Sequence, residues 1–373
     1  SAVAIGCNRI VVSALYADTD GLYNNGAVYI YDMSMNKLAT VVAQSGIRAG
    51  NSNYGRDVAV ADGLIVVGMT GTGTDYGYVE VLDLNGNHKF TINQVGTYVD
   101  SDFGDRVAIG CGVIAVGETA WDDTPTTASR VGRLHLFDYS GTLIQTIVNP
   151  FSTNNGSNSN ARFPSDIAIG DSKVIAGNGG RNSKKGRVYV YDLKGNLIKE
   201  LQDPDDDHRD KFGNSVAIGS GKIVIGAPEW DYSLRETSDG GQGAFYIFDS
   251  NLNFESRQTL GLTSYTEIGF GFSVDVKHGR IVVGSKHSDQ VSRPHWSTGF
   301  GNGLFRVYDL EGNYLWERKA SHVVADQIPE VTPESNTTTA DFGYAVGIYG
   351  GKIIVSAPRD ESGTTGVYGG ALH

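Results

Sequence analysis

The chain has 373 residues and a formal net charge of −12. This acidic balance argues against nonspecific nucleic-acid binding and against docking to anionic lipid headgroups, because both need clustered Lys and Arg. No apolar run reaches the ~18 residues of a membrane-spanning helix, so we expect no membrane insertion. Glycine occurs 50 times, and Tyr and Phe (19 and 14) far outnumber Met (3), a balance typical of many short strands joined by tight turns.

One phrase recurs along the whole chain. It reads aromatic-Gly-x-x-(Val/Ile)-Ala-(Ile/Val)-Gly, then a turn, then (Lys/Arg)-Ile-Val-Val-Gly, although the first copy lacks its aromatic-Gly. The copies begin at Ser1, Tyr54, Phe103, Phe163, Phe212, Phe270 and Phe342. Self-similarity at a near-constant spacing indicates a repeat architecture in which each copy is one structural unit.

A second phrase follows each of the first six copies, as in GAFYIFD at 243–249. It ends in an aspartate, at Asp32, Asp83, Asp138, Asp192, Asp249 and Asp309. A turn, often containing Gly-Asn, and a short apolar stretch complete each unit, as in 196–201. Each unit therefore predicts four short strands.

These strands are apolar on both faces. In 27–31, Val28 and Ile30 point one way, and Tyr29 and Tyr31 point the other way. A strand that is apolar on both faces is buried on both faces, which four-stranded sheets stacked face to face around an axis achieve. We therefore predict an all-β fold with very little helix, a single seven-bladed β-propeller over 1–373 with four-stranded antiparallel blades. The approximate units are 1–53, 54–102, 103–162, 163–211, 212–269, 270–341 and 342–373.

The seventh unit stops where its third strand should begin, so we expect an incomplete last blade in this chain. A blade without its outer strands would expose unpaired backbone. We expect that edge to be covered by further residues or by a neighbouring subunit.

The repeats resemble a known family. The phrases Phe212-Gly213 and Gly226-Ala227-Pro228 resemble the FG-GAP repeat, which implies the seven-bladed propeller of integrin α-subunit headpieces. Gly-Ala-Pro is complete only in the fifth unit. The amino-acid sequence of the repeat is also similar to that of FG-GAP proteins of marine bacteriophage virions, which implies a tail-fibre or other virion-surface role.

The resemblance also raises the question of calcium. The integrin type often carries a Ca²⁺ loop of the form Asp-x-(Asp/Asn)-x-(Asp/Asn)-Gly, and the nearest pieces here are Asp18 with Asp20 and Asp205 with Asp207. Neither piece has the full ligand series. These four residues are candidate Ca²⁺ ligands or, alternatively, hydrated acidic turns, and we predict no obligatory cofactor.

Tryptophan side chains mark candidate ligand sites in the loops after the second strand. The candidates are Trp121, Asp122, Asp123, Trp230, Asp231, Tyr232, His295 and Trp296. An aromatic ring beside carboxylates can stack on a sugar and accept hydrogen bonds from its hydroxyls; alternatively, each Trp covers the rim of its blade. Trp316 lies in a predicted fourth strand, where we expect it to pack.

No pattern in the sequence predicts catalysis. The eight His residues show no nucleophile–base or metal-ligand spacing, so we name no catalytic residue and predict that the protein is not an enzyme. Cys7 and Cys111 occupy the same turn in units one and three. Equivalent positions two blades apart exceed the ~7 Å limit between the Cα atoms of a disulfide, so we expect two free thiols.

Together these features predict a structural or binding propeller on a virion or other extracellular surface. Its partners would be other subunits of that assembly and a host-surface glycan. One alternative is a secreted or cell-surface integrin-like adhesin that binds a protein ligand through Ca²⁺-stabilised loops. A second is a propeller hydrolase or lyase acting on glycans.

Overall fold

The structure is a computed structural model of the full chain. It describes residues 2–19, 25–44, 53–71, 76–96, 101–122, 130–150, 162–179, 186–205, 210–230, 241–261, 269–285, 303–319, 342–357 and 371–372. All regular secondary structure in these ranges is β-strand, as the repeat pattern predicts. No helix able to cross a membrane occurs in this part of the chain.

The described strands form six four-stranded sheets and one three-stranded sheet, here called blades. Within each blade the strands are antiparallel and lie side by side in chain order. Four-stranded antiparallel blades of a β-propeller are therefore confirmed. By their internal contacts the residues group into two compact units, 1–181 with 187–201 and 182–186 with 202–373.

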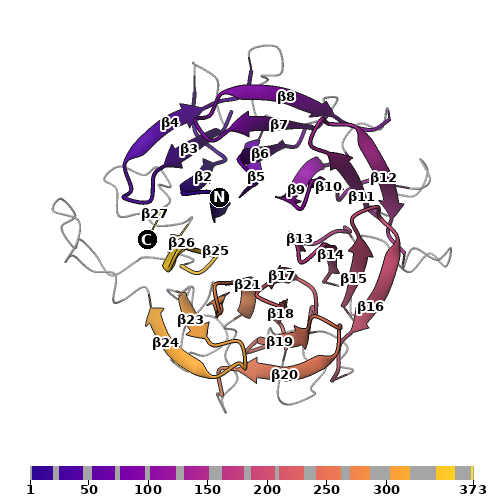
Figure 1. Ribbon diagram of the computed structural model, residues 1–373, viewed down its shortest axis with the longest axis vertical. Coiled ribbons are helices and arrows are strands. Elements are labelled where there is room, and N and C mark those ends of the chain that lie inside the picture. The colour runs from indigo at the N-terminus through magenta and orange to yellow at the C-terminus, as the bar shows by residue number, and fades with distance from the viewer. Residues whose placement is uncertain are drawn as a thin grey trace, which may run out of the picture. The chain divides into compact units, whose positions relative to one another are not determined.

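The first unit holds four blades. Their strands are β1 (Val3–Gly6), β2 (Arg9–Ala14), β3 (Ala27–Tyr31) and β4 (Lys37–Val41); β5 (Tyr54–Ala61), β6 (Leu64–Met69), β7 (Tyr78–Asp83) and β8 (His88–Asn93); β9 (Phe103–Gly110), β10 (Val113–Glu118), β11 (Arg133–Asp138) and β12 (Leu143–Val148); and β13 (Ile167–Gly170), β14 (Lys173–Asn178), β15 (Arg187–Asp192) and β16 (Leu197–Gln202). In Figure 1 the blades run from inner strands β5, β9 and β13 to outer strands β8, β12 and β16.

The second unit holds three blades. Their strands are β17 (Ser215–Gly219), β18 (Lys222–Ala227), β19 (Ala244–Asp249) and β20 (Phe254–Thr259); β21 (Phe270–Lys277), β22 (Arg280–Ser285), β23 (Leu304–Tyr308) and β24 (Tyr314–Lys319); and β25 (Val346–Tyr349), β26 (Lys352–Ala357) and β27 (Ala371–Leu372). The last blade shows three described strands, and β27 pairs with β26 where the sequence predicted the start of a third strand.

The hydrophobic core lies between consecutive blades. On β6, Ile65 and Val67 pack into a cluster with the blade before, whereas Leu64 and Val66 pack into a cluster with the blade after. Val66 and Val67 are both fully buried. On β6 the two-sided apolar pattern of the sequence thus corresponds to one core layer on each face of the blade, and burying one valine stabilises the fold by roughly 1.5–3 kcal/mol.

Glycine allows these blades to approach closely. A Cβ built on Gly77, at the start of β7, would lie 2.1 Å from the carbonyl oxygen of Phe103 on the next blade. A Cβ on Gly68, near the end of β6, would lie 2.1 Å from the carbonyl oxygen of Gly104. Only glycine fits where one backbone packs directly on another.

The turn between the first and second strand has the same form in every blade. Both of its residues have positive φ, as in Cys111 (53°) and Gly112 (83°). This is the type I′ geometry that matches the twist of a hairpin. Cys7 and Cys111 each occupy the first turn position, and both are free, which confirms the prediction that they are not bonded to each other.

The turn between the third and fourth strand is also uniform. In the fourth blade, Asp192 Oδ1 accepts hydrogen bonds from the N–H groups of Lys194 (2.8 Å) and Asn196 (2.9 Å), and Oδ2 accepts one from Asn196 Nδ2 (2.8 Å). The recurring aspartate of the sequence is therefore the residue that shapes this turn.

In each antiparallel blade these two uniform turns lie at one end, and the remaining connections lie at the other. The connections after the second strand differ in length and comprise 15–26, 70–77, 119–132, 179–186, 228–243 and 286–303. The linkers that lead into the next blade vary as well. Each blade thus has one constant end and one variable end, and we call the latter the loop end.

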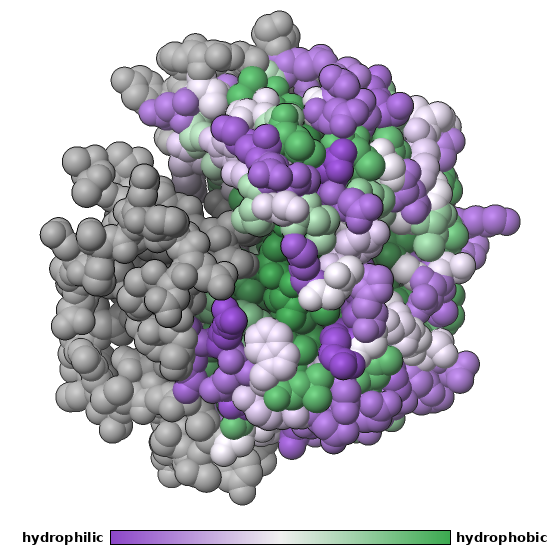
Figure 2. Space-filling view, turned by 60° about the vertical axis from the view of Figure 1, so that its left-hand side comes forward, coloured by the Kyte–Doolittle hydropathy of each residue, from purple (hydrophilic) through white to green (hydrophobic). Residues whose placement is uncertain are grey.

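The outer strands expose several apolar side chains. Trp316 on β24 packs against Phe305 in an edge-to-face geometry, at 5.4 Å between ring centroids, as predicted, but it is still 41% exposed. Figure 2 shows apolar residues interspersed with polar ones over the visible face. Such scattered exposure is normal for a protein surface and marks no site by itself.

Candidate binding site at the loop end

The pairing register shifts near the start of the inner strand in three blades, on β5 between Tyr54 and Val58 and as a β-bulge on β9 and β21. On β9, Phe103 pairs with Glu118 but Arg106 already pairs with Gly117, so Asp105 falls in the bulge. The same shift on β21 places Phe272 in a bulge between Phe270 and Ser273. The preceding glycines have φ of 88° (Gly104) and 87° (Gly271), a conformation that glycine adopts without strain. Bulges of this kind re-aim a side chain and are frequent next to binding sites.

The second residue after the aromatic is here called the bulge position of each unit. This position is occupied by Arg56, Asp105 and Ser165 in repeats of the first compact unit and by Asn214, Phe272 and Tyr344 in repeats of the second compact unit. Around it the repeat hardly changes, since the aromatic two residues earlier is buried in all six copies that have one, from Tyr54 to Phe342. A position that differs in every copy of a constant frame is the pattern expected where side chains contact a ligand rather than support the fold.

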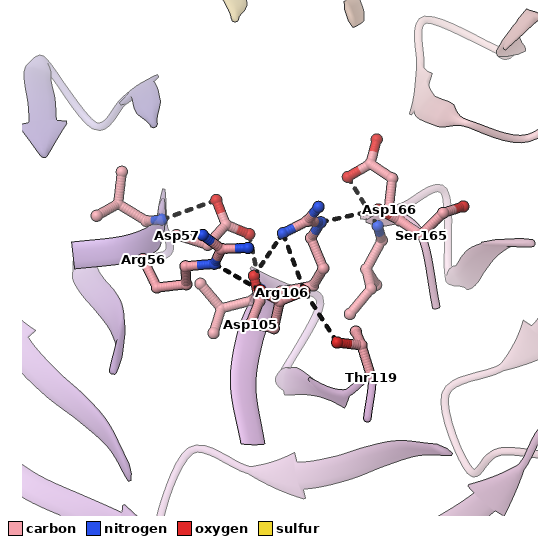
Figure 3. Close-up of polar contacts among 10 residues, drawn as sticks. Arg56, Asp57, Asp105, Arg106, Thr119, Ser165 and Asp166 are labelled. Atoms are coloured by element: carbon pink, nitrogen blue, oxygen red, sulfur yellow. Dashed lines mark hydrogen bonds and ion pairs between the residues drawn. The ribbon is translucent and has the colours of Figure 1, made fainter. Parts of the chain in front are cut away.

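In the first unit the bulge positions join into a charged network (Figure 3). Arg56 Nε donates to Asp105 Oδ1 on the next blade at 2.5 Å. Thr119 Oγ1 donates to Asp105 Oδ2 at 3.0 Å. Arg106 Nε donates to the carbonyl oxygen of Ser165, one blade further on, at 2.8 Å. The second blade therefore contacts the third, and the third contacts the fourth, through the two arginines.

Aspartates next to the bulge positions link the same blades. Asp57 accepts hydrogen bonds from the N–H of Val58 (2.9 Å) and from the N–H of Val107 on the next blade (2.8 Å). Burial raises the pKa of Asp57, against the opposing effects of Arg106 and these two N–H groups. Burial also opposes ionisation of Asp105, but Arg106 and Arg56 outweigh it and hold the pKa of that carboxyl below its usual value.

In the second unit the bulge positions carry a different chemistry. The rings of Phe272 and Tyr344 lie 5.1 Å apart between centroids, at an interplanar angle of 47°. Asn214 Nδ2 donates to the carbonyl oxygen of Phe272 at 3.2 Å. An aromatic pair with a neighbouring amide thus occupies the positions that hold ionic groups in the first unit.

The structure brings two of the sequence-predicted residues together near the loop end of the fifth blade. Arg257 lies over the ring of Trp230 at 4.4 Å and forms an ion pair with Asp205. Asp205 Oδ2 also accepts a hydrogen bond from the hydroxyl of Tyr246 at 2.9 Å. Trp230 is 6% exposed, so in this conformation its ring packs at the base of the loop and one face is covered by Arg257.

Trp121 has the same arrangement in the third blade. Arg133 lies over its ring at 4.7 Å and pairs with the buried carboxylate of Glu118. Glu118 also accepts a hydrogen bond from His135 Nε2 (2.8 Å), and His135 Nδ1 contacts Thr146 Oγ1 at 3.0 Å. Burial lowers the pKa of His135, against the opposing effect of its hydrogen bond to Glu118. Neither Glu118 nor His135 was predicted from the sequence as a site residue.

Other candidate residues are more dispersed or lie outside the described residues. Asp122 is buried, and Asp18 is exposed in another blade. Asp20, Asp123, Asp207, Asp231, Tyr232, His295 and Trp296 lie outside the described residues. In the part of the chain that the structure describes, no three His, Cys, Asp or Glu side chains come together as potential metal ligands.

The sequence analysis also did not single out the bulge positions. A signal was present, because aligning the repeats shows one position that changes its chemistry in every copy. What the sequence could not show is that neighbouring bulge positions touch, because their partners lie a whole repeat apart.

Comparison with known families agrees with the repeat pattern. Residues 197–248, which run from β16 through β19, match the FG-GAP repeat. A search among curated proteins finds no match to the chain.

Proposed function

We propose that this FG-GAP repeat β-propeller is a non-enzymatic binding protein of a virion or other extracellular surface, and that it recognises a host-surface glycan through the loop end of its blades. One observation carries the proposal: uniform turns occupy one end of every blade, and all connections of variable length occupy the other. A rigid frame with one variable end is a common way to build a recognition surface.

The glycan part of the proposal draws on the composition of that end. The sequences after Trp121 and Trp230 are acidic, and carboxylates accept hydrogen bonds from sugar hydroxyls. Because Arg257 already covers one face of Trp230, that face is not available for stacking on a sugar ring in this structure. The extracellular or virion setting is supported by the similarity of the repeats to FG-GAP proteins of phage virions.

The test is binding of the purified full chain to an array of immobilised glycans. We expect binding that falls at least tenfold when residues 123–129 and 231–240 are replaced by Gly/Ser sequences of equal length. The matched control is Lys194→Ala, an exposed turn residue at the constant end, which should bind normally. Absence of glycan binding, or release of reducing sugar from bound glycans, would contradict the proposal.

A further inference from the structure

The aromatic pair of the second unit stands apart from the hydrophobic core. Tyr344 is 37% exposed, whereas the buried aromatics that precede the bulge positions, such as Phe270 and Phe342, are 0–2% exposed. Neither Phe272 nor Tyr344 belongs to the core clusters that join β21 to its neighbouring blades. Packing of the core therefore does not explain why two large rings lie side by side here.

The blades that carry the two rings are tied together beside them. Ser273 Oγ donates to the carbonyl oxygen of Gly343 at 2.9 Å. Asp275 accepts hydrogen bonds from the N–H groups of Val276 and, on the next blade, Ile348, both at 2.8 Å. These bonds fix the inner strands immediately next to Phe272 and Tyr344, so the rings are held in position without a ligand. Preorganisation of this kind reduces the entropy that binding would otherwise cost.

We propose that Phe272 and Tyr344 form a stacking platform for one pyranose ring of a glycan, with the Asn214 amide and the Tyr344 hydroxyl as polar contacts at its edge. This inference rests on the proposed function and gives it a second, more specific site. The C–H groups on one face of a pyranose are weakly positive and fit the negative face of an aromatic ring. An amide and a phenol supply both donors and acceptors for sugar hydroxyls.

A cationic ligand is the main chemical alternative for exposed aromatic rings. It fits less well, because two rings contact a cation from one side only, whereas aromatic cages for cations enclose them. Two rings inclined at 47° also leave an open face rather than a closed aromatic cage. A neutral ring-shaped ligand is the better match.

Saturation-transfer NMR on the full chain tests the site. The probes are methyl β-D-galactopyranoside, methyl β-D-glucopyranoside and tetramethylammonium. For wild type we expect saturation of ring C–H protons of at least one pyranoside. Phe272→Ala and Tyr344→Ala should each weaken its binding about tenfold, the loss of one stacking contact. Tyr344→Phe keeps the ring and should retain binding within about threefold.

The matched control is Trp316→Ala, which removes an exposed aromatic from outer strand β24 of the same unit and should leave binding unchanged. Thermal unfolding of each variant verifies that it is folded. Should the alanine variants unfold, Phe272→Leu and Tyr344→Leu keep an apolar side chain but remove the aromatic ring, and each should weaken binding in the same way. Glycan-array binding that persists in the platform variants would place the site elsewhere and leave the proposed function intact. Saturation transfer to tetramethylammonium alone would show that the platform binds a cation and would contradict the pyranose proposal. If the wild type binds neither a pyranoside nor any glycan on the array, both proposals are wrong.

Discussion

Arg56 and Asp105 lie at equivalent positions of neighbouring blades, and their side chains meet at 2.5 Å between Nε and Oδ1. The same carboxylate receives the hydroxyl of Thr119 from within its own blade. The side chain of Asp105 is 8% exposed, whereas the side chain of Arg56 is 37% exposed. The buried aspartate thus holds a partly exposed arginine in place. The pair links two neighbouring blades and makes the stability of the protein depend on the charge of Asp105.

The first prediction concerns pH. Because the pKa of Asp105 is lowered in the folded protein, its charged form contributes stability above the ordinary Asp pKa of ~3.9, and this contribution is lost as pH falls below that value. Asp105→Asn should lower the free energy of unfolding at pH 7 by about 1–3 kcal/mol. Denaturant unfolding at several pH values should show the difference from wild type narrowing below pH ~4.

A control for this effect is Glu311→Gln, which removes an exposed carboxylate from a turn on another blade. It should leave stability nearly unchanged at every pH. A wild-type–Asp105→Asn difference that grows on acidification would show that the sign of the pKa shift is wrong.

The second prediction tests the close approach of blades. Gly77→Ala places a Cβ 2.1 Å from the carbonyl oxygen of Phe103, closer than two nonbonded atoms can approach, so the two blades must shift apart. We expect a loss of roughly 1–3 kcal/mol or more. Gly63→Asn is the control, since a Cβ at Gly63 meets nothing within 4 Å and asparagine tolerates its positive φ. If urea unfolding gives the same free energy of unfolding for Gly77→Ala and wild type, the close approach of Gly77 to the backbone of Phe103 is wrong.

The third prediction concerns the type I′ turns. Cys111 has φ of 53° at the first turn position and is followed by Gly112. Cys111→Asn creates the Asn-Gly pair that this turn favours and should raise stability by about 0.5 kcal/mol. Cys111→Val should lower it, because a β-branched residue is strained at positive φ. The midpoint of thermal unfolding ranks the three proteins, and the order Val above Asn would refute the turn assignment.

The fourth prediction separates structure from binding at Trp230. Its ring is 6% exposed and lies under Arg257, so Trp230→Ala should cost about 3–5 kcal/mol through the cavity it creates. Trp230→Phe should restore much of that loss. If denaturant unfolding shows Trp230→Ala to be as stable as wild type, the tryptophan does not support the loop base and direct ligand contact becomes the better explanation.

The sequence by itself determined the periodic frame. The repeat set where each blade begins, two-sided apolar strands such as β6 required a core layer on each face, and the recurring aspartates marked the turn before each fourth strand. These features depend on local sequence and on burial, and both repeat with the chain.

Only the tertiary structure decided which side chains meet. Arg56 reaches Asp105, Asp275 reaches Ile348 and Phe272 lies against Tyr344 because stacking brings equivalent residues of successive repeats together, and bulges re-aim some of them. The tryptophans stood out in the sequence as candidate sugar contacts, yet the structure places arginines from later strands over Trp121 and Trp230. Such contacts depend on spacing between strands and on side-chain direction, which a linear pattern does not contain.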